Sequence, residues 1–153
     1  MKSRKAISDL IATVLIVLIT IAAVGIIWGA IMPIIKSNIE SSQKCTNAGL
    51  EINTQSGYTY VSGENISIQI SRGASTIALN GIQIKIMDKT GNSNTTVLGI
   101  AYVPVANADK VYNFNVTAMG LDKTGIKKVG VAPIVALGNL NYTCPMRESE
   151  MPQ

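Results

Sequence analysis

Few side chains in this sequence can take part in covalent or acid–base chemistry, and those present favour cross-linking over catalysis. The 153 residues include no histidine, the commonest acid–base group and metal ligand. The two cysteines, Cys45 and Cys144, bracket most of the C-terminal region. Two thiols without histidine cannot complete a structural zinc site, so we expect no metal and no cofactor. A disulfide is the better interpretation for a chain with the marks of export, and its loop of roughly 100 residues would contribute about 4–5 kcal/mol.

Surface modification is the second kind of chemistry that the sequence offers. Four N-x-[ST] sequons are present, none with proline in the middle position, at Asn65, Asn94, Asn115 and Asn141. In an exported domain each is a candidate acceptor for an N-linked glycan, which would shield strand faces and edges. The alternative is that these asparagines are ordinary polar residues of strands and turns.

No catalytic arrangement accompanies these residues. Serines and threonines are common, but the sequence contains no histidine base, no paired carboxylates and no phosphate-binding glycine loop. The acidic residues are scattered beside predicted turns and strand ends, and we expect them to be solvated; they include Glu51, Glu64, Asp88, Asp109 and Asp122. The sequence therefore predicts a protein that is not an enzyme.

The formal net charge of +4 comes mostly from the first six residues, which include Lys2, Arg4 and Lys5. The other ten Lys and Arg residues nearly balance nine Asp and Glu residues. They are mixed with the acids and form no long run, so we expect no dedicated nucleic-acid binding. The N-terminal cluster is instead typical of a targeting segment.

Residues Leu10 to Ile35 contain no charged side chain. As a helix this run would span roughly 40 Å, enough to cross the ~30 Å hydrocarbon core of a bilayer. It is apolar around its whole circumference, so lipid or other protein must bury it. The basic residues before it place the N-terminus in the cytoplasm and the rest of the chain outside. A cleaved secretory signal has a shorter apolar stretch of about 7–15 residues, whereas a permanent signal anchor fits both length and charge.

The junction before this run, RKAISDL at residues 4–10, resembles the class III signal peptide of archaeal type IV pilins. The resemblance covers roughly the first thirty residues, and it implies that a prepilin peptidase cuts between Ala6 and Ile7. Residues 7–44 would then remain as an apolar helix and stalk, first in the membrane and later in the core of a helical filament of identical subunits. Two positions depart from related patterns: Ser8-Asp9 stands where many archaeal members have Ser-Pro, and Ile11 where bacterial pilins have glutamate.

Three further residues of the apolar helix could serve assembly. Asp9 lies in the first turn, where the helix dipole favours an anion, and it could also pair with the new α-amino group of Ile7 on the same or an adjacent subunit. Gly25 and Gly29 form a G-x-x-x-G spacing that lets helix backbones approach closely. Pro33 would kink or loosen the end of the run.

Beyond the helix the apolar residues alternate with polar ones, which is typical of half-buried strands. The alternation is clear in the runs 66–70, 82–86 and 112–116, and Asn80-Gly81 predicts a two-residue hairpin before the second run. Turn signals such as Lys89-Thr90-Gly91 separate about seven or eight short strands, which favours a small β-sandwich. The resemblance to pilins implies an immunoglobulin-like version of this domain. The predicted fold is therefore α+β, with a leader at 1–6, the helix at 7–44, a β-sandwich at 45–146 and a polar tail at 147–153.

Together these features predict the structural subunit of an extracellular type IV pilus-like filament that serves adhesion or surface attachment. Its partners would be identical subunits, the prepilin peptidase with the pilus assembly machinery, and the cytoplasmic membrane before assembly. Two alternatives stay open. One is a membrane-anchored β-sandwich binding module that does not polymerise, and the other is a subunit of the archaellum, a motility filament.

Overall fold

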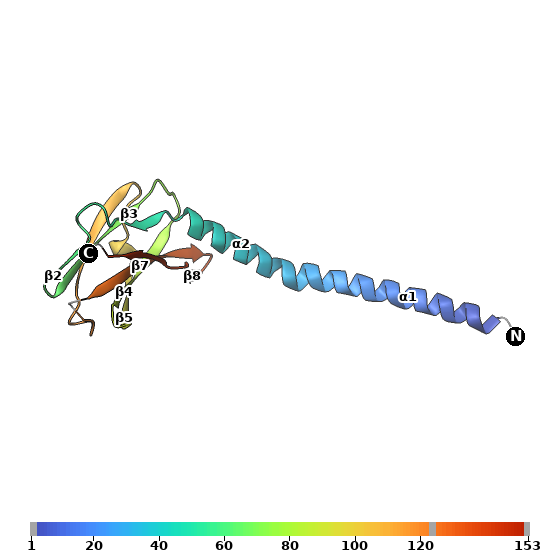
Figure 1. The fold of residues 1–153 in the computed structure, drawn as a ribbon. Coiled ribbons are helices and arrows are strands. Elements are labelled where there is room, and N and C mark those ends of the chain that lie inside the picture. Colours follow the sequence, from blue (N-terminus) through green and yellow to red (C-terminus); the bar gives the residue numbers. More distant parts are fainter. Residues whose placement is uncertain (1–2, 123–124, 152–153) are drawn as a thin grey trace. The chain divides into compact units, whose positions relative to one another are not determined.

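The computed structural model describes residues 3–122 and 125–151, with side chains from Leu10 onward. The chain divides into two compact units, Met1–Glu40 and Ser41–Gln153. The first consists of α1 (Ser3–Ile26), a π-helical turn η1 (Ile27–Ile31) and the beginning of α2 (Met32–Asn47). The second contains the last turns of α2 and two antiparallel sheets (Figure 1).

The π-helical turn is the structural response to Pro33. Proline has no backbone N–H to donate to the carbonyl four residues earlier, and its ring would clash with that carbonyl. The hydrogen-bonded turn contains one more residue here than in an α-helix, because the N–H of Met32 donates to the carbonyl of Ile27, five residues back. The expected disturbance near Pro33 is therefore present, yet the helix continues to Asn47 rather than to the predicted end at residue 44.

The first sheet is built around β3 (Asn65–Arg72). Strand β6 (Ala108–Asn115) pairs with β3 along its whole length. Two short strands, β1 (Leu50–Ile52) and β2 (Tyr60–Ser62), pair with opposite ends of β3. All three pairings are antiparallel.

The second sheet has the order β5-β4-β7-β8. Its long central strands are β4 (Leu79–Asp88) and β7 (Ile126–Leu137), with β5 (Ser93–Gly99) on the far side of β4. Strand β8 (Leu140–Thr143) pairs with one end of β7, and β9 (Arg147–Glu150) pairs with the other. A short 3-10 helix η2 (Ile100–Tyr102) follows β5.

The inward faces of the two sheets form one hydrophobic core, so the domain is a β-sandwich. In β4 the buried residues mostly alternate with less buried ones, as period-two side-chain alternation predicts, whereas β3 over 66–70 and β7 over 129–135 are buried on both faces. The fully buried residues of β3, β4 and β7 include Ile66, Ile68, Ile70, Ile82, Ile84, Ile86, Val129, Val131 and Val135. The predicted α+β fold, a long N-terminal helix followed by a β-sandwich, is confirmed.

The hairpin predicted at Asn80-Gly81 is wrong, because both residues lie within β4. Gly81 is needed there for close packing: a Cβ at this position would lie 2.6 Å from the carbonyl oxygen of Leu98 on β5. The register against β7 also shifts between Leu79 and Gly81, which marks a bulge. The chain reverses between β4 and β5 at the predicted Lys89-Thr90-Gly91 turn instead, where Gly91 has a φ of 95°.

The segment predicted as a polar tail from Arg147 is structured over its first four residues, which form β9. Its charged side chains find partners on the sandwich: Arg147 pairs with Glu51 at 3.0 Å, and Glu148 pairs with Lys85 at 3.5 Å. The next residue, Met151, is buried. A charged strand of this kind can add to a sheet while its outer edge stays unattractive to other strands.

Candidate functional site

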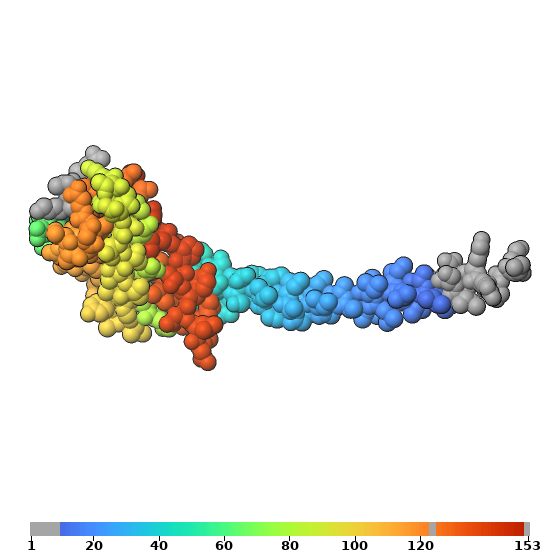
Figure 2. All heavy atoms as spheres, turned by 90° about the horizontal axis from the view of Figure 1, so that it is seen from below, coloured from blue at the N-terminus to red at the C-terminus, as the bar shows by residue number. Residues whose placement is uncertain are grey.

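The surface of the apolar helix is the most unusual feature of the described chain. Between Leu10 and Ile35 every Leu, Ile and Val side chain and that of Trp28 is between 44% and 66% exposed, and Met32 is half-buried (Figure 2). The helix is long and apolar enough to cross a membrane, with a mean hydropathy of 3.0 in its most apolar window and none of that window buried. Exposed apolar area on this scale marks a surface that lipid or protein covers.

The two glycines predicted for helix packing lie in the apolar part of this surface. Gly25 is in α1 and Gly29 is in the π-helical turn. No atom of the described chain lies within 4 Å of a Cβ built at either position, apart from the helix backbone itself. Both positions are therefore open to close approach by a second helix.

The predicted leader cleavage point falls inside a helix. Ala6, Ile7 and Asp9 belong to α1, and their side chains lie outside the described part of the structure. Cleavage after Ala6 and the pairing of Asp9 with an amino group thus stay predictions.

The C-terminal end of α2 is fastened to the sandwich by a covalent bond, as predicted. Cys45 and Cys144 form a disulfide with their Cα atoms 5.4 Å apart, and the N–H of Cys144 donates to the carbonyl of Pro133 on β7 at 2.9 Å. Next to it, the Lys44 ammonium donates to the carbonyl oxygen of Ala136 at 3.0 Å. Sequence reasoning missed the role of Lys44, because its partner is 92 residues away and leaves no local signal.

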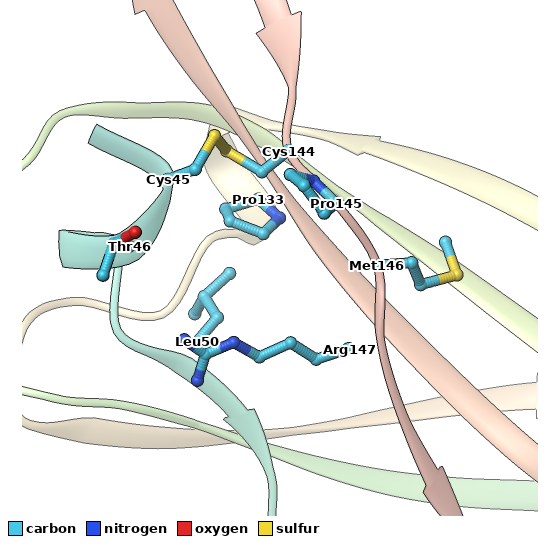
Figure 3. Close-up of a pocket in the computed structure, with 8 residues that line it drawn as sticks. All are labelled: Cys45, Thr46, Leu50, Pro133, Cys144, Pro145, Met146 and Arg147. Atoms are coloured by element: carbon cyan, nitrogen blue, oxygen red, sulfur yellow. A yellow bond between two sulfur atoms is a disulfide. The ribbon is translucent and has the colours of Figure 1, made fainter. Parts of the chain in front are cut away.

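A small pocket of about 160 Å³ lies beside the disulfide (Figure 3). Leu50, Pro133 and Met146 supply apolar walls, and Arg147 lines one side. Ligand pockets usually enclose about 300–1,000 Å³, so this volume is too small for an organic ligand of ordinary size. Arg147 is also engaged with Glu51. We therefore treat the pocket as a packing irregularity at the helix attachment.

Asp88 is not solvated, contrary to the expectation for the acidic residues. It is 1% exposed, and its carboxylate accepts hydrogen bonds from the Thr90 hydroxyl at 2.7 Å, the Asn92 N–H at 2.8 Å and the Asp122 N–H at 3.3 Å. The Thr90 hydroxyl, followed by these backbone N–H groups, lowers the pKa of Asp88 from its ordinary 3.8 to about 2, although burial opposes the shift. Asp88 thus joins the β4–β5 turn to the segment before β7.

The four sequons lie in three different settings. Asn65 begins β3 and is the direct cross-strand partner of Asn115, the last residue of β6. Asn94 is on the outer strand β5, and Asn141 is on the outer strand β8. Asn94 is half-buried, and the other three are exposed.

Within the described ranges, no three His, Cys, Asp or Glu side chains gather as a metal site would require. Comparisons with protein-family models, with curated proteins and with solved structures find no match to this chain.

Proposed function

We propose that this chain is the structural subunit of an extracellular type IV pilus-like filament used for adhesion or surface attachment. The observation that carries the proposal is the continuous apolar surface of the helix from Leu10 to Ile35, which no other described segment covers. In a filament, the helices of neighbouring subunits would bury this surface and the β-sandwiches would lie outside them. Repeated head-to-tail contacts that do not close into a ring produce such open assemblies.

The order of events follows from the charges before the helix. Lys2, Arg4 and Lys5 would hold the uncleaved N-terminus at the cytoplasmic face of the membrane. Cleavage after Ala6 would remove all three, and the helix could then leave lipid for the equally apolar surfaces of other helices. The resemblance of residues 4–10 to class III signal peptides supports this step.

Gly25 and Gly29 support packing of the helix against other helices. Glycine within a helix costs about 1 kcal/mol relative to alanine, and a helix that meets only lipid gains nothing in return. Close contact with a neighbouring backbone would offset this cost. The open space around both glycines is the space that such a neighbour would fill.

The attachment at the end of α2 suits a subunit under tension. Force on a filament would reach each sandwich through the last turn of its helix. The Cys45–Cys144 disulfide and the Lys44–Ala136 hydrogen bond connect that turn directly to the segment after β8 and to β7, the central strand of the second sheet.

N-terminal sequencing of material sheared from the surface of producing cells tests the proposal. We expect filaments whose subunits begin at Ile7. An intact Met1 or Lys2 on protein that stays in the membrane, without filaments, would instead identify a membrane-anchored binding module.

Substitutions in the helix separate processing from assembly. Gly29→Leu should abolish filaments while cleavage continues, whereas Ala30→Leu, which adds similar bulk on another face, should have a smaller effect. Asp9→Ala should reduce assembly without reducing cleavage. Unchanged filaments in Gly29→Leu would show that this face does not pack against another subunit.

A further inference from the structure

The four sequons are equivalent in sequence but not in the folded domain. Transfer of an N-linked glycan requires that the Asn Nδ2 atom attack the anomeric carbon of a glycosyl phosphate donor. A C–N bond forms, the C–O bond to phosphate breaks, the phosphate leaves with the electron pair, and one Nδ2 proton passes to a base of the transferase. The Nδ2 atom and the hydroxyl two residues later must therefore both be accessible.

Asn94 fails the first requirement. Its Nδ2 atom donates a hydrogen bond to the Met119 carbonyl at 2.9 Å. Along β5 it shares a face with Thr96 and Leu98, both half-buried, and Leu98 packs against the core. Because side chains alternate between the faces of a strand, Asn94 points towards the interior side of the sheet.

Asn65 fails the second requirement. Its sequon hydroxyl belongs to Ser67, which is only 9% exposed and donates to the Oδ1 atom of Asn113 at 2.7 Å. Asn65 is also directly opposite Asn115 in the β3–β6 pair. Opposite Cβ atoms are about 5 Å apart, so a glycan on Asn115 would crowd Asn65.

Asn115 meets both requirements. Its side chain is exposed, and its Oδ1 atom accepts a hydrogen bond from the Ala118 N–H at 2.8 Å. This bond engages the carboxamide oxygen and not the nitrogen that would attack the donor. The sequon hydroxyl on Thr117 is exposed in the turn after β6.

Asn141 also meets both requirements, an accessible Nδ2 atom and an accessible sequon hydroxyl. Its Oδ1 atom accepts from the Nδ2 atom of Asn80 at 2.7 Å, and both Asn141 and Thr143 are exposed. Strand β8 is an outer strand without a charged residue, and Leu140 is 75% exposed on it. A glycan here would cover an edge that otherwise lacks protection against pairing with other strands.

We infer that Asn115 and Asn141 carry N-linked glycans, added after the domain has folded, and that Asn65 and Asn94 stay unmodified. The inference rests on the external location of the sandwich, which is part of the proposed function. A glycosyl phosphate donor and a transferase outside the membrane are the partners that it requires.

Glycopeptide mass spectrometry of the full chain, purified from cells that produce it, tests this inference. We expect glycans on the peptides that contain Asn115 and Asn141. Thr117→Ala and Thr143→Ala should each remove one glycan mass from the intact protein without altering the hydrogen bonds of the asparagines. Thr117→Ser and Thr143→Ser, which keep the sequons, should retain the glycans.

Ser67→Ala and Thr96→Ala should leave the glycan mass unchanged. Similar occupancy at all four sequons would overturn the inference, because it would mean transfer to the unfolded chain, and bare Asn115 and Asn141 would overturn it as well. The same peptide map identifies the first residue of the mature chain. Bare sequons on a chain that begins at Ile7 would refute only the glycan inference, whereas glycans on a chain with an intact leader would support it and refute only the filament proposal.

Discussion

Reduction of the Cys45–Cys144 disulfide should remove a large part of the stability of the β-sandwich. The two cysteines are 99 residues apart. In the chain-entropy model, closing a loop of this length destabilises the unfolded chain by about 4.7 kcal/mol at 25 °C. The total free energy of unfolding of a domain of this size is about 5–15 kcal/mol, so the reduced form should be marginally stable. With a urea m value of about 1.5 kcal/mol/M, the unfolding midpoint should fall by about 3 M.

The aromatic residues allow this unfolding to be followed in the full chain in detergent. All five tyrosines lie between residues 58 and 142, and Trp28 in the helix is the single tryptophan. In a Trp28→Phe background, tyrosine fluorescence therefore reports the β-sandwich without a contribution from the helix. Urea titrations with and without reductant give the two midpoints.

A Cys45→Ala/Cys144→Ala variant is the control, since reductant should not change its midpoint. If reduction lowers the unfolding free energy of the protein with both cysteines by less than about 1 kcal/mol, the loop-closure reasoning is refuted. The helix end would then be held mainly by contacts such as the Lys44–Ala136 hydrogen bond.

Three further predictions concern the sandwich. The pKa of Asp88 falls from 3.8 to about 2 on folding, so the contribution of its carboxylate to stability should be complete above pH 4 and should disappear as the pH falls towards 2. Asp88→Asn should therefore lower the thermal midpoint at pH 7 and make the midpoint less dependent on pH between 4 and 2. Ile84→Ala, at a side chain that is 1% exposed, should lower the free energy of unfolding measured in urea by about 3–4 kcal/mol. Gly81→Ala should cost about 1–3 kcal/mol because its Cβ would meet the Leu98 carbonyl, whereas Gly99→Ala, with nothing within 4 Å, should cost clearly less in the same assay.

The sandwich could be predicted from the sequence because its main signal is local. The isoleucines at 66, 68 and 70 and at 82, 84 and 86 alternate with polar residues, and burial of one strand face requires that pattern. The disulfide could be predicted because no third cysteine competes for either partner. The apolar helix was evident for the same reason, since residues Leu10 to Ile35 contain no charged side chain.

Features that depend on distant partners could not be predicted. Asn80-Gly81 has the composition of a turn, but Gly81 pairs with β5 and β7 and lies too close to the Leu98 carbonyl for a side chain. Asp88 gains its buried network only when the segment near Asp122 comes beside the β4–β5 turn. The sequence of β9 is charged and resembles a polar tail, because its partners Glu51 and Lys85 lie on distant strands.

The helix lies between these cases. Pro33 predicts a disturbance, but sequence alone does not decide between a kink and a π-helical turn. The π form keeps the backbone carbonyls largely bonded, which is consistent with a helix that must avoid exposed polar groups in an apolar environment.

The covalent ring from Cys45 to Cys144 also changes what a protease can do to this protein. Loop tips on exposed domains are preferred cleavage sites, and the loops that connect β1 through β8 lie between these two cysteines. A single cut at any of them leaves two pieces that are still joined through sulfur, so no fragment separates from the helix. Two cuts within the ring are needed to release a fragment from it, so a chain with one cut there keeps its β-sandwich attached to its helix.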